Sequence, residues 1–432
     1  MGKYFMETYG CPMNTAESQA LAQSLLEHGH TPATQPEEAD WVIINTCSVR
    51  QSAEDRVYGR LGFFKTVKKE QNPNLKVALI GCMAAKTDAK KELMRAPFYV
   101  DAVLPHNERD QFLRLFEGSQ VDTSEEPQFS FYSYHPSDDG IHAFLPIMHG
   151  CNNFCSFCII PYLRGREKSR TKEDIVQEIQ RHVEHGVKEI TLLGQNVNSY
   201  QDGETDFPAL IRYISKHVNG KVWFRFTSSH PKDFNIELIS ALQSDSRFCP
   251  HLHVAVQHGS NRLLKEMCRE TKREKFESLV AEVRQQWPEI ALVTDLMVGF
   301  PSETEDDMQE LFDMLDTVQF EDAFMYFYNT RPGTPAAKRT DTVEESVKSE
   351  RLQRLIDKQR AISHEILRQQ IGQTREVLLI SPAKKTKGGF LGRTQRNENV
   401  VVEGNHIKVG DFVQVTLTDI KGQTLLCELT TE

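Results

Sequence analysis

Three cysteines close together, Cys151, Cys155 and Cys158, have the clearest chemical meaning in this sequence. Their C-x3-C-x2-C spacing brings three thiolates into one short loop, a ligand set for an iron–sulfur cube whose fourth iron has no protein ligand. Clusters that only carry electrons normally have four cysteines, whereas a vacant position is typical of metal sites that bind substrate. Zinc is the alternative, but it prefers C-x2-C pairs with a further ligand downstream.

Three more cysteines, Cys11, Cys47 and Cys82, follow one another at intervals of 36 and 35 residues. Each of them closes an apolar, β-rich run, and the first run is followed by a helical pattern over 15–28. This rhythm of strand, turn and helix indicates βαβ units and a parallel sheet, in which ligands bind at the carboxyl ends of the strands. We therefore expect these cysteines to converge on a second cluster with one open iron. Three unrelated buried cysteines are the alternative.

The remaining cysteines, Cys249, Cys268 and Cys427, show no such pattern. Cys268 lies in a helical run and Cys427 in a late β-rich segment, so we expect both to be small buried apolar side chains rather than ligands.

The central part of the chain must position the cysteine loop. Six strand candidates alternate there with amphipathic helices; they cover 144–150, 189–194, 222–227, 251–256, 291–298 and 322–328. Six units rather than eight predict an open, partial α/β barrel with its chemistry at the carboxyl ends of the strands. Polar groups stand at these ends, including Gln195, Ser229, Gln257 and Gly299. Ligand contact and capping of the next helix both account for such residues.

A long charged helix over 343–370 precedes a β-rich segment punctuated by glycines, which predicts a small β-barrel. The fold class is therefore α/β, with a Rossmann-like N-terminal domain, a partial (β/α)6 barrel and a small C-terminal β-barrel. The predicted boundaries are 1–118 for the first domain, 119–140 for a polar linker, 141–370 for the central domain and 371–432 for the last.

Five basic residues stand together on the C-terminal barrel without an acidic one, namely Lys384, Lys385, Lys387, Arg393 and Arg396. On a small β-barrel such a patch suggests contact with RNA phosphates, although a solvated loop is the ordinary alternative. The net charge of −10 argues against general coating of nucleic acid, so any RNA contact must come from local patches.

Composition agrees with an intracellular enzyme, and we expect the protein to be cytoplasmic. The chain has 432 residues, of which 39% are hydrophobic, and no run of 18 apolar residues, so we expect no membrane span. It starts in a predicted strand without an apolar signal segment. Thiols at metal-ligand spacing belong in a reducing compartment.

Several motifs resemble the radical S-adenosylmethionine (SAM) methylthiotransferase family over the whole chain. They cover 8–14 (TYGCPMN), 150–161 (GCNNFCSFCIIP), 164–170 (RGREKSR), 193–198 (LGQNVN) and 331–336 (RPGTPA). They resemble the branch that modifies tRNA rather than the branch that modifies a ribosomal-protein aspartate, because the latter tends to an acidic residue where Arg331 stands. Pro12 and His258 depart from the glutamine and serine that are usual in that branch.

The resemblance implies a C-terminal TRAM domain and two [4Fe-4S] clusters, one on each cysteine set. It implies that one SAM gives a methyl group and another a radical, and that carbon 2 of an isopentenyl-adenosine next to the anticodon of tRNA is methylthiolated. Implied SAM contacts are Phe157, Gln195, Ser229, Gln257 and Gly299, and RNA contacts are Arg164, Arg166, Arg170 and Arg331 beside the C-terminal patch. The implied partners are tRNA, an electron donor of flavodoxin or ferredoxin type and a sulfur source. We expect the enzyme itself to be a monomer.

Two alternatives remain at this stage. The same clusters could serve methylthiolation of a ribosomal-protein aspartate. A protein that is not an enzyme, such as an iron–sulfur electron carrier or redox-sensing RNA binder, would not need the predicted barrel or its polar mouth.

Overall fold

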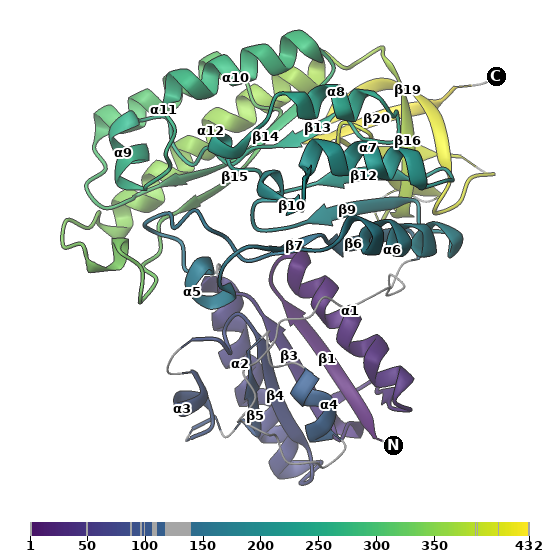
Figure 1. Cartoon of the computed structure of the whole chain (residues 1–432), viewed down its shortest axis with the longest axis vertical. Coiled ribbons are helices and arrows are strands. Elements are labelled where there is room, and N and C mark those ends of the chain that lie inside the picture. The colour runs from purple at the N-terminus through teal and green to yellow at the C-terminus, as the bar shows by residue number, and fades with distance from the viewer. Residues whose placement is uncertain are drawn as a thin grey trace. The chain divides into compact units, whose positions relative to one another are not determined.

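The chain forms two compact units in the computed structural model (Figure 1). The first comprises 1–138, 144–152 and 158–170, and the second comprises 139–143, 153–157 and 171–432. Because the loop with Cys151 crosses between them, the units do not coincide with the predicted domain boundaries, which remain predictions. The structure describes residues 2–48, 51–86, 89–95, 97–98, 100–105, 110–116, 140–384, 386, 388–404 and 406–430. The predicted linker lies outside them except for its last residue.

A parallel sheet of order β2-β1-β3-β4-β5 forms the centre of the first unit. Successive side chains of β3 point to opposite faces: Trp41 and Ile43 pack with α1 and α4, whereas Val42 and Ile44 pack with α2. The elements are β1 (Lys3–Tyr9), α1 (Pro12–Glu27), β2 (Thr31–Pro32), β3 (Trp41–Thr46), α2 (Gln51–Glu70), β4 (Lys76–Gly81), α3 (Ala89–Leu93), β5 (Ala102–Leu104) and α4 (Asp110–Phe116). The three strands expected before the cysteines are present.

The segment around the cysteine loop begins with β6 (His142–Pro146) and contains a small antiparallel pair of strands, β7 (Met148–His149) and β8 (Lys168–Ser169). Between these two strands lies the short helix α5 (Ile160–Arg164).

The strands of the central region form two three-stranded sheets, of order β12-β9-β6 and β13-β14-β15. Isolated parallel bridges, Phe224 with Phe248 and Ser229 with Val254, join the two sheets. The six strands therefore follow in the predicted order, and the join between β12 and β13 is looser than in one continuous sheet. The strands are β9 (Glu189–Leu193), β12 (Trp223–Phe226), β13 (His251–His253), β14 (Ala291–Val298) and β15 (Asp322–Phe327).

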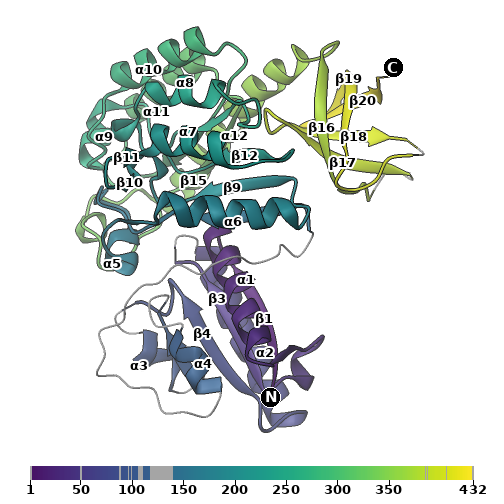
Figure 2. The same ribbon diagram turned by 45° about the vertical axis from the view of Figure 1, so that its right-hand side comes forward.

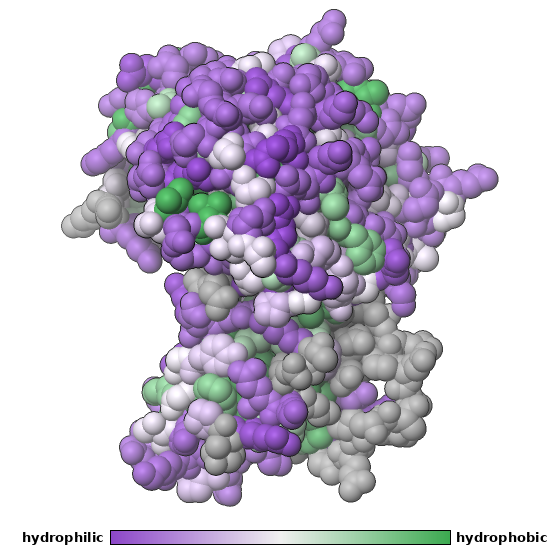
Figure 3. Space-filling model, turned by 90° about the vertical axis from the view of Figure 1, so that its left-hand side faces the viewer, coloured by the Kyte–Doolittle hydropathy of each residue, from purple (hydrophilic) through white to green (hydrophobic). Residues whose placement is uncertain are grey.

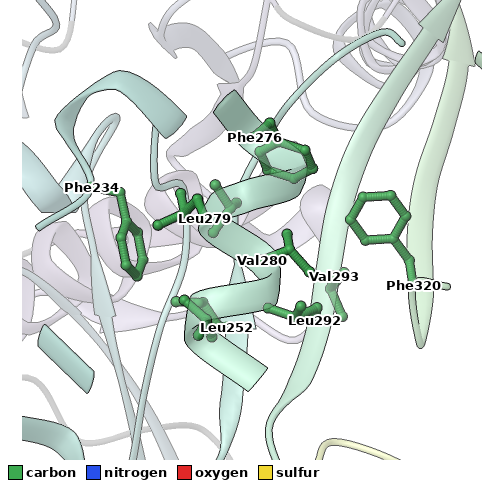
Figure 4. Close-up of a pocket in the computed structure, with 10 residues that line it drawn as sticks. Phe234, Leu252, Phe276, Leu279, Val280, Leu292, Val293 and Phe320 are labelled. Carbon is green, nitrogen blue, oxygen red and sulfur yellow. The ribbon is translucent and has the colours of Figure 1, made fainter. Parts of the chain in front are cut away.

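Helices connect these strands, as expected for a partial α/β barrel (Figure 1). They are α6 (Lys172–Glu184), α7 (Phe207–His217), α8 (Glu237–Gln243), α9 (Asn261–Glu266), α10 (Arg273–Gln286), α11 (Glu305–Val318) and α12 (Glu345–Arg368), with a short hairpin of β10 (Gln201–Asp202) and β11 (Thr205–Asp206). An apolar gap between α10 and the sheet, lined by Leu252, Val280, Leu292 and Phe320 among others, has a volume of about 10 Å³ (Figure 4). It has room for one water at most, so it is a packing gap rather than a ligand site.

The C-terminal strands close into a barrel of order β16-β17-β18-β20-β19, shown in yellow in Figure 2. Its core is aliphatic, with Val377, Val400, Val415 and Leu425 fully buried. The strands are β16 (Thr374–Pro382), β17 (Gly389–Thr394), β18 (Asn399–Glu403), β19 (Phe412–Lys421) and β20 (Thr424–Leu429). The barrel confirms the predicted fold, while β17 was not foreseen as a strand.

The surface in Figure 3 is mainly hydrophilic, with apolar side chains in small separate groups. No helix among the described residues is long and apolar enough to cross a membrane.

Candidate metal centres and cofactor site

Cys11, Cys47 and Cys82 stand just after the carboxyl ends of three adjacent strands. Cys11 is the residue before α1, while the amides of Cys47 and Cys82 bond to the last residues of the neighbouring strands, at 2.9 Å to Tyr9 O and 2.9 Å to Thr46 O. Cys47 and Cys82 are each only 1% exposed. A hydrogen bond with Cys47, helped by the nearby Arg164 guanidinium, outweighs burial and lowers the pKa of the Cys11 thiol to about 6. The sheet thus brings the three sulfurs to one edge.

A buried amide network supports this edge. Asn45 donates from Nδ2 to Asn14 O at 2.9 Å and accepts from Asn14 Nδ2 at 3.0 Å, while Asn14 Oδ1 accepts from Cys11 Sγ at 3.2 Å. Gly10 leaves no room for a side chain, because a Cβ there would lie 2.7 Å from Cys47 Cβ and 2.5 Å from Asn14 Oδ1. Glycine at this position therefore lets the backbone approach the cysteines closely.

Arg164, at the end of α5, contributes a cation to the same edge. Its Nε donates to Cys82 Sγ at 3.1 Å, and its Nη1 and Nη2 donate to the carboxylate of Glu17 at 2.8 and 3.3 Å. Nη1 also lies 3.3 Å from His149 Nδ1. The side chain is 5% exposed. Arg164 was predicted to contact RNA, but here its guanidinium is buried against a cysteine and a carboxylate, so that interpretation does not fit.

The second cysteine set lies in the loop before α5, as its spacing requires. Cys151 N donates to Gly165 O at 3.1 Å. The preceding Gly150 has φ +80°, and a Cβ there would come within 2.2 Å of Arg166 O, so this turn requires glycine. Separately, Arg269 donates from Nη1 to Cys155 Sγ at 3.1 Å and from Nη2 to Ala255 O. Cys155 is buried, and Cys158 is partly exposed.

The donor chemistry of both sets fits iron–sulfur clusters. All nine cysteines are described and none forms a disulfide. One sulfur in each set accepts a hydrogen bond from a buried arginine, and such bonds stabilise thiolates that carry iron. No three donor side chains among the described residues stand close enough to share one metal ion. A cluster does not require this, because each of its cysteines binds a different iron.

The five residues predicted to contact SAM stand in the second unit. Four of them follow β9, β12, β13 and β14, while Phe157 packs on the apolar group around Met297 and Tyr328. Ser229 Oγ donates to Asn198 Oδ1 at 3.0 Å, and Gln257 Oε1 accepts from Tyr326 Oη at 2.6 Å. The structure thus places Gln195, Ser229, Gln257 and Gly299 after the carboxyl ends of the strands and Phe157 in the cysteine loop. Contact of these residues with SAM remains a prediction. Gln195 is partly buried.

A buried carboxylate behind Gly299 was not recognised in the sequence. Glu303 accepts hydrogen bonds from Gly299 N at 2.8 Å and from Arg351 Nη1 at 3.0 Å, and lies 3.4 Å from His258 Nε2. Gly299 has φ +70°, which favours glycine. The fully buried His258, a departure from the usual serine, is thus placed against Glu303. Only the fold brings Arg351 of α12 to this strand end.

Several further arginines predicted to contact RNA are also buried. Arg170 donates to Pro146 O at 3.1 Å, and Arg331 is 8% exposed. Arg166 and Lys384 are exposed, as phosphate contact requires. Lys385 and Lys387 lie outside the described residues.

Two arginines of the C-terminal patch attach the barrel to the central strands instead. Arg393 donates to Glu189 Oε1 at 3.0 Å, and Arg396 donates to Glu321 Oε1 at 3.1 Å and to Glu289 O. Arg225 completes this contact, with bonds to Glu189 Oε2 at 2.7 Å and to Thr394 O at 2.8 Å. The basic patch predicted from sequence is therefore partly an internal interface, because acidic residues far away in the chain neutralise it.

Comparison with known proteins identifies the family. Models of the radical SAM superfamily, the uncharacterized protein family UPF0004 and the TRAM domain match residues 145–315, 3–105 and 368–430. The tRNA-2-methylthio-N(6)-dimethylallyladenosine synthase of Treponema denticola is 40% identical over 99% of both chains. That of Acetivibrio thermocellus is 41% identical over 98% of this chain and 90% of its own. The chain belongs to this synthase family.

Solved structures with a similar fold include other radical SAM enzymes. The methyltransferase TsrM of Kitasatospora setae has a TM-score of 0.56 at 14% identity, covering 78% of this chain and 77% of its own. The cobalamin-dependent enzyme OxsB has a TM-score of 0.55 at 13% identity, covering 78% of this chain and 55% of its own. At these identities the likeness concerns the fold alone. The predicted methylthiotransferase family and its three-part fold are confirmed.

Proposed function

We propose that this synthase-family chain methylthiolates carbon 2 of N6-isopentenyladenosine next to the anticodon of tRNA. The convergence of Cys11, Cys47 and Cys82 on one sheet edge carries the proposal, in a chain that also has the Cys151 loop and matches the synthases along its whole length. The aromatic C–H bond of the substrate is too strong and too weakly acidic for acid–base catalysis by side chains. Cofactors therefore supply the chemistry, and the protein positions them.

The cofactors are SAM and two [4Fe-4S] clusters. Cys151, Cys155 and Cys158 would hold the radical cluster, and the other three cysteines would hold the auxiliary cluster. When bound, the radical cluster supplies the electron that cleaves SAM to methionine and a 5′-deoxyadenosyl radical, and the auxiliary cluster supplies a site for the sulfur that is methylated and delivered.

The protein positions the cofactors and excludes water from the reaction. Burial of Cys47 and Cys82 excludes water from the auxiliary site, and the Asn14–Asn45 pair fixes the loop of Cys11 relative to the strand of Cys47. For SAM we propose contacts at Phe157, Gln195, Ser229, Gln257 and Gly299. Glu303 supports the last of these by holding its backbone amide.

The substrate RNA needs positive charge at the surface. We propose Arg166, Lys384, Lys385 and Lys387 as its phosphate contacts; the first two are exposed. The physiological partners we propose are an electron donor of flavodoxin or ferredoxin type and a sulfur source. We propose that the enzyme works as a monomer in the cytoplasm.

The alternatives raised by the sequence are not favoured. The two relatives named above, which match along nearly the whole chain, are tRNA-2-methylthio-N(6)-dimethylallyladenosine synthases, and this weighs against a ribosomal-protein aspartate as the substrate. Membership of a synthase family weighs against a mere electron carrier or RNA sensor.

Product analysis tests the proposal. The reconstituted protein would be incubated without oxygen with isopentenylated tRNA, SAM, sulfide and a low-potential reductant, and the nucleosides measured by mass spectrometry. We expect the 2-methylthio derivative, and none with tRNA that lacks the isopentenyl group. Modification of a ribosomal protein in place of tRNA would overturn the proposal.

A further inference from the structure

A buried arginine donates a hydrogen bond to one cysteine sulfur in each metal-binding set. Arg164 Nε lies 3.1 Å from Cys82 Sγ, and Arg269 Nη1 lies 3.1 Å from Cys155 Sγ. The two arginines are 5% and 4% exposed. The bonds have the same length and chemistry although they belong to different units of the chain.

The charges around these two arginines differ. Glu17 accepts from both terminal nitrogens of Arg164, and this carboxylate is itself 6% exposed, so the pair is close to neutral within the interior. Arg269 instead bonds to the Ala255 carbonyl, and its Nε has no partner. Within the described part of the chain, no carboxylate pairs with Arg269.

This difference has a direct electrostatic meaning. A cluster becomes more negative when it gains an electron, so a nearby positive charge and N–H···S hydrogen bonds both favour the reduced form and raise the reduction potential. In a buried site such a charge is weakly screened. A carboxylate on the same guanidinium removes most of the effect of the charge but leaves the hydrogen bond in place.

We propose that Glu17 is a positioning residue that keeps the auxiliary cluster at a low reduction potential by neutralising Arg164, while Arg164 holds the Cys82 sulfur. This inference rests on the proposed function, because it requires a cluster on Cys11, Cys47 and Cys82. Its consequence is that an electron from the donor is directed to the cluster beside the unneutralised Arg269. The auxiliary cluster then stays oxidised while it handles sulfur.

A purely structural role is the competing explanation. The Arg164–Glu17 ion pair also ties α5 to α1, and a buried pair that loses one member destabilises the fold. The two roles differ in what they change: a structural role affects cluster retention and melting temperature, whereas neutralisation affects the potential of a cluster that is still fully bound.

The experiment measures the auxiliary cluster alone. In full-length chain carrying Cys151→Ala, Cys155→Ala and Cys158→Ala, the potential would be titrated anaerobically and followed by electron paramagnetic resonance. Glu17→Gln, which keeps shape but removes the negative charge, should shift the midpoint to a more positive value at unchanged iron content. Arg164→Gln combined with Glu17→Gln restores a neutral pair, so its midpoint should return toward that of the parent.

The matched control is the other cluster. In full-length chain carrying Cys11→Ala, Cys47→Ala and Cys82→Ala, Arg269→Gln should shift the midpoint to a more negative value. An unchanged or more negative midpoint in Glu17→Gln with its cluster retained would overturn the inference. Equal loss of iron from Glu17→Gln and from the double variant Arg164→Gln, Glu17→Gln would also overturn the inference, because that outcome shows a structural role. If the parent chain forms methylthiolated tRNA but holds no iron on Cys11, Cys47 and Cys82, the inference fails while the reaction stands.

Discussion

At the scale of single residues, the two cysteine sets have separable roles. Replacing Cys47 by alanine removes one of the three proposed ligands of the auxiliary cluster, a buried cysteine, and leaves the Cys151 loop intact. We therefore expect Cys47→Ala to form no methylthiolated nucleoside while reductive cleavage of SAM to 5′-deoxyadenosine continues. Chromatography of both products from one reaction measures this. Normal methylthiolation by Cys47→Ala would disprove the auxiliary cluster, and Cys268→Ala, which removes an exposed thiol, is the matched control.

The converse variant concerns the radical cluster. Cys155→Ala should lose that cluster and keep the auxiliary one, so bound iron should fall to roughly half and 5′-deoxyadenosine should disappear. Iron determination together with product chromatography tests both parts. Continued SAM cleavage would contradict the assignment of Cys155.

His230 provides a residue-scale prediction on pH. Burial, with the charges of Arg269 and Lys232, lowers the pKa of His230 to about 2 from its usual 6.5. The folded protein keeps this ring neutral, whereas the unfolded chain binds a proton below about pH 6.5. Stability is therefore lost as the pH falls below that value, by up to about 1.4 kcal/mol per pH unit.

The measurement compares melting temperatures of the cluster-free protein and of His230→Gln between about pH 7 and pH 5. Glutamine can still accept the bond that His230 Nδ1 takes from Lys232 N, at 3.2 Å, but does not titrate. We expect the melting temperature of the parent protein to fall more on acidification than that of His230→Gln. Parallel pH profiles would show that His230 does not contribute.

Residue types and spacing predicted that Cys11, Cys47 and Cys82 follow strands, but they did not predict which arginines are buried. Cysteine side chains at the ends of strands have few common roles. The regular spacing of Cys11, Cys47 and Cys82 in the sequence was therefore enough to relate them to one another. An arginine in a basic stretch has many uses, and whether it is buried depends on a carboxylate distant in sequence, such as Glu17 for Arg164 at a separation of 147 residues. Cys268 was expected to be buried and is exposed, because α9 ends at Glu266 and the chain turns there.

At the scale of elements, the attachment of the C-terminal barrel depends on Arg225 of β12. This arginine is fully buried, ion-paired with Glu189, and bonded to the carbonyls of Thr394 and Gln395 on the barrel. Arg225→Ala leaves Glu189 without that partner, and breaking a buried pair costs roughly 3–5 kcal/mol.

We expect the barrel of Arg225→Ala to be released by a protease at concentrations that leave the parent intact. Gel electrophoresis over a protease series measures this. Arg212→Ala removes an exposed arginine of α7 and should change stability by no more than about 0.5 kcal/mol. Equal protease resistance of the Arg225 variant and the parent would show that other contacts hold the barrel.

Element prediction succeeded for the continuous apolar run of β3 and failed at β17, which glycines interrupt. All six residues of β3 are buried, and this run was visible in the sequence. By contrast β17 (Gly389–Thr394) contains two glycines, and Gly392 lies against Val377 where a Cβ would come within 2.3 Å of a side-chain carbon. Close packing thus requires the residue that makes β17 look like a loop.

At the scale of the whole molecule, tRNA must bind a chain with a net charge of −10. Because Arg393 and Arg396 are engaged in the internal interface, we propose Lys384, Lys385 and Lys387 as the RNA contacts of the barrel patch. Changing Lys384, Lys385 and Lys387 to glutamine should weaken tRNA binding and make its salt dependence shallower by about one unit of slope per lost phosphate contact.

Filter binding across a salt series tests this, and SAM cleavage without RNA should be unchanged. The matched control changes three exposed lysines around α10, Lys265, Lys272 and Lys275, to glutamine. This control alters the net charge equally and should leave the slope unchanged. Equal slopes for the patch variant and the parent would exclude the barrel patch as an RNA contact.

The position of Arg164 along the chain also bears on how the protein matures during translation. The ribosome produces Cys11, Cys47 and Cys82 early, but the guanidinium that bonds to Cys82 is made 82 residues later. Since domains fold as the chain emerges, the nascent sheet carries its three cysteines before Arg164 has been made. The hydrogen bond to the Cys82 sulfur therefore forms only after the α5 segment has left the exit tunnel.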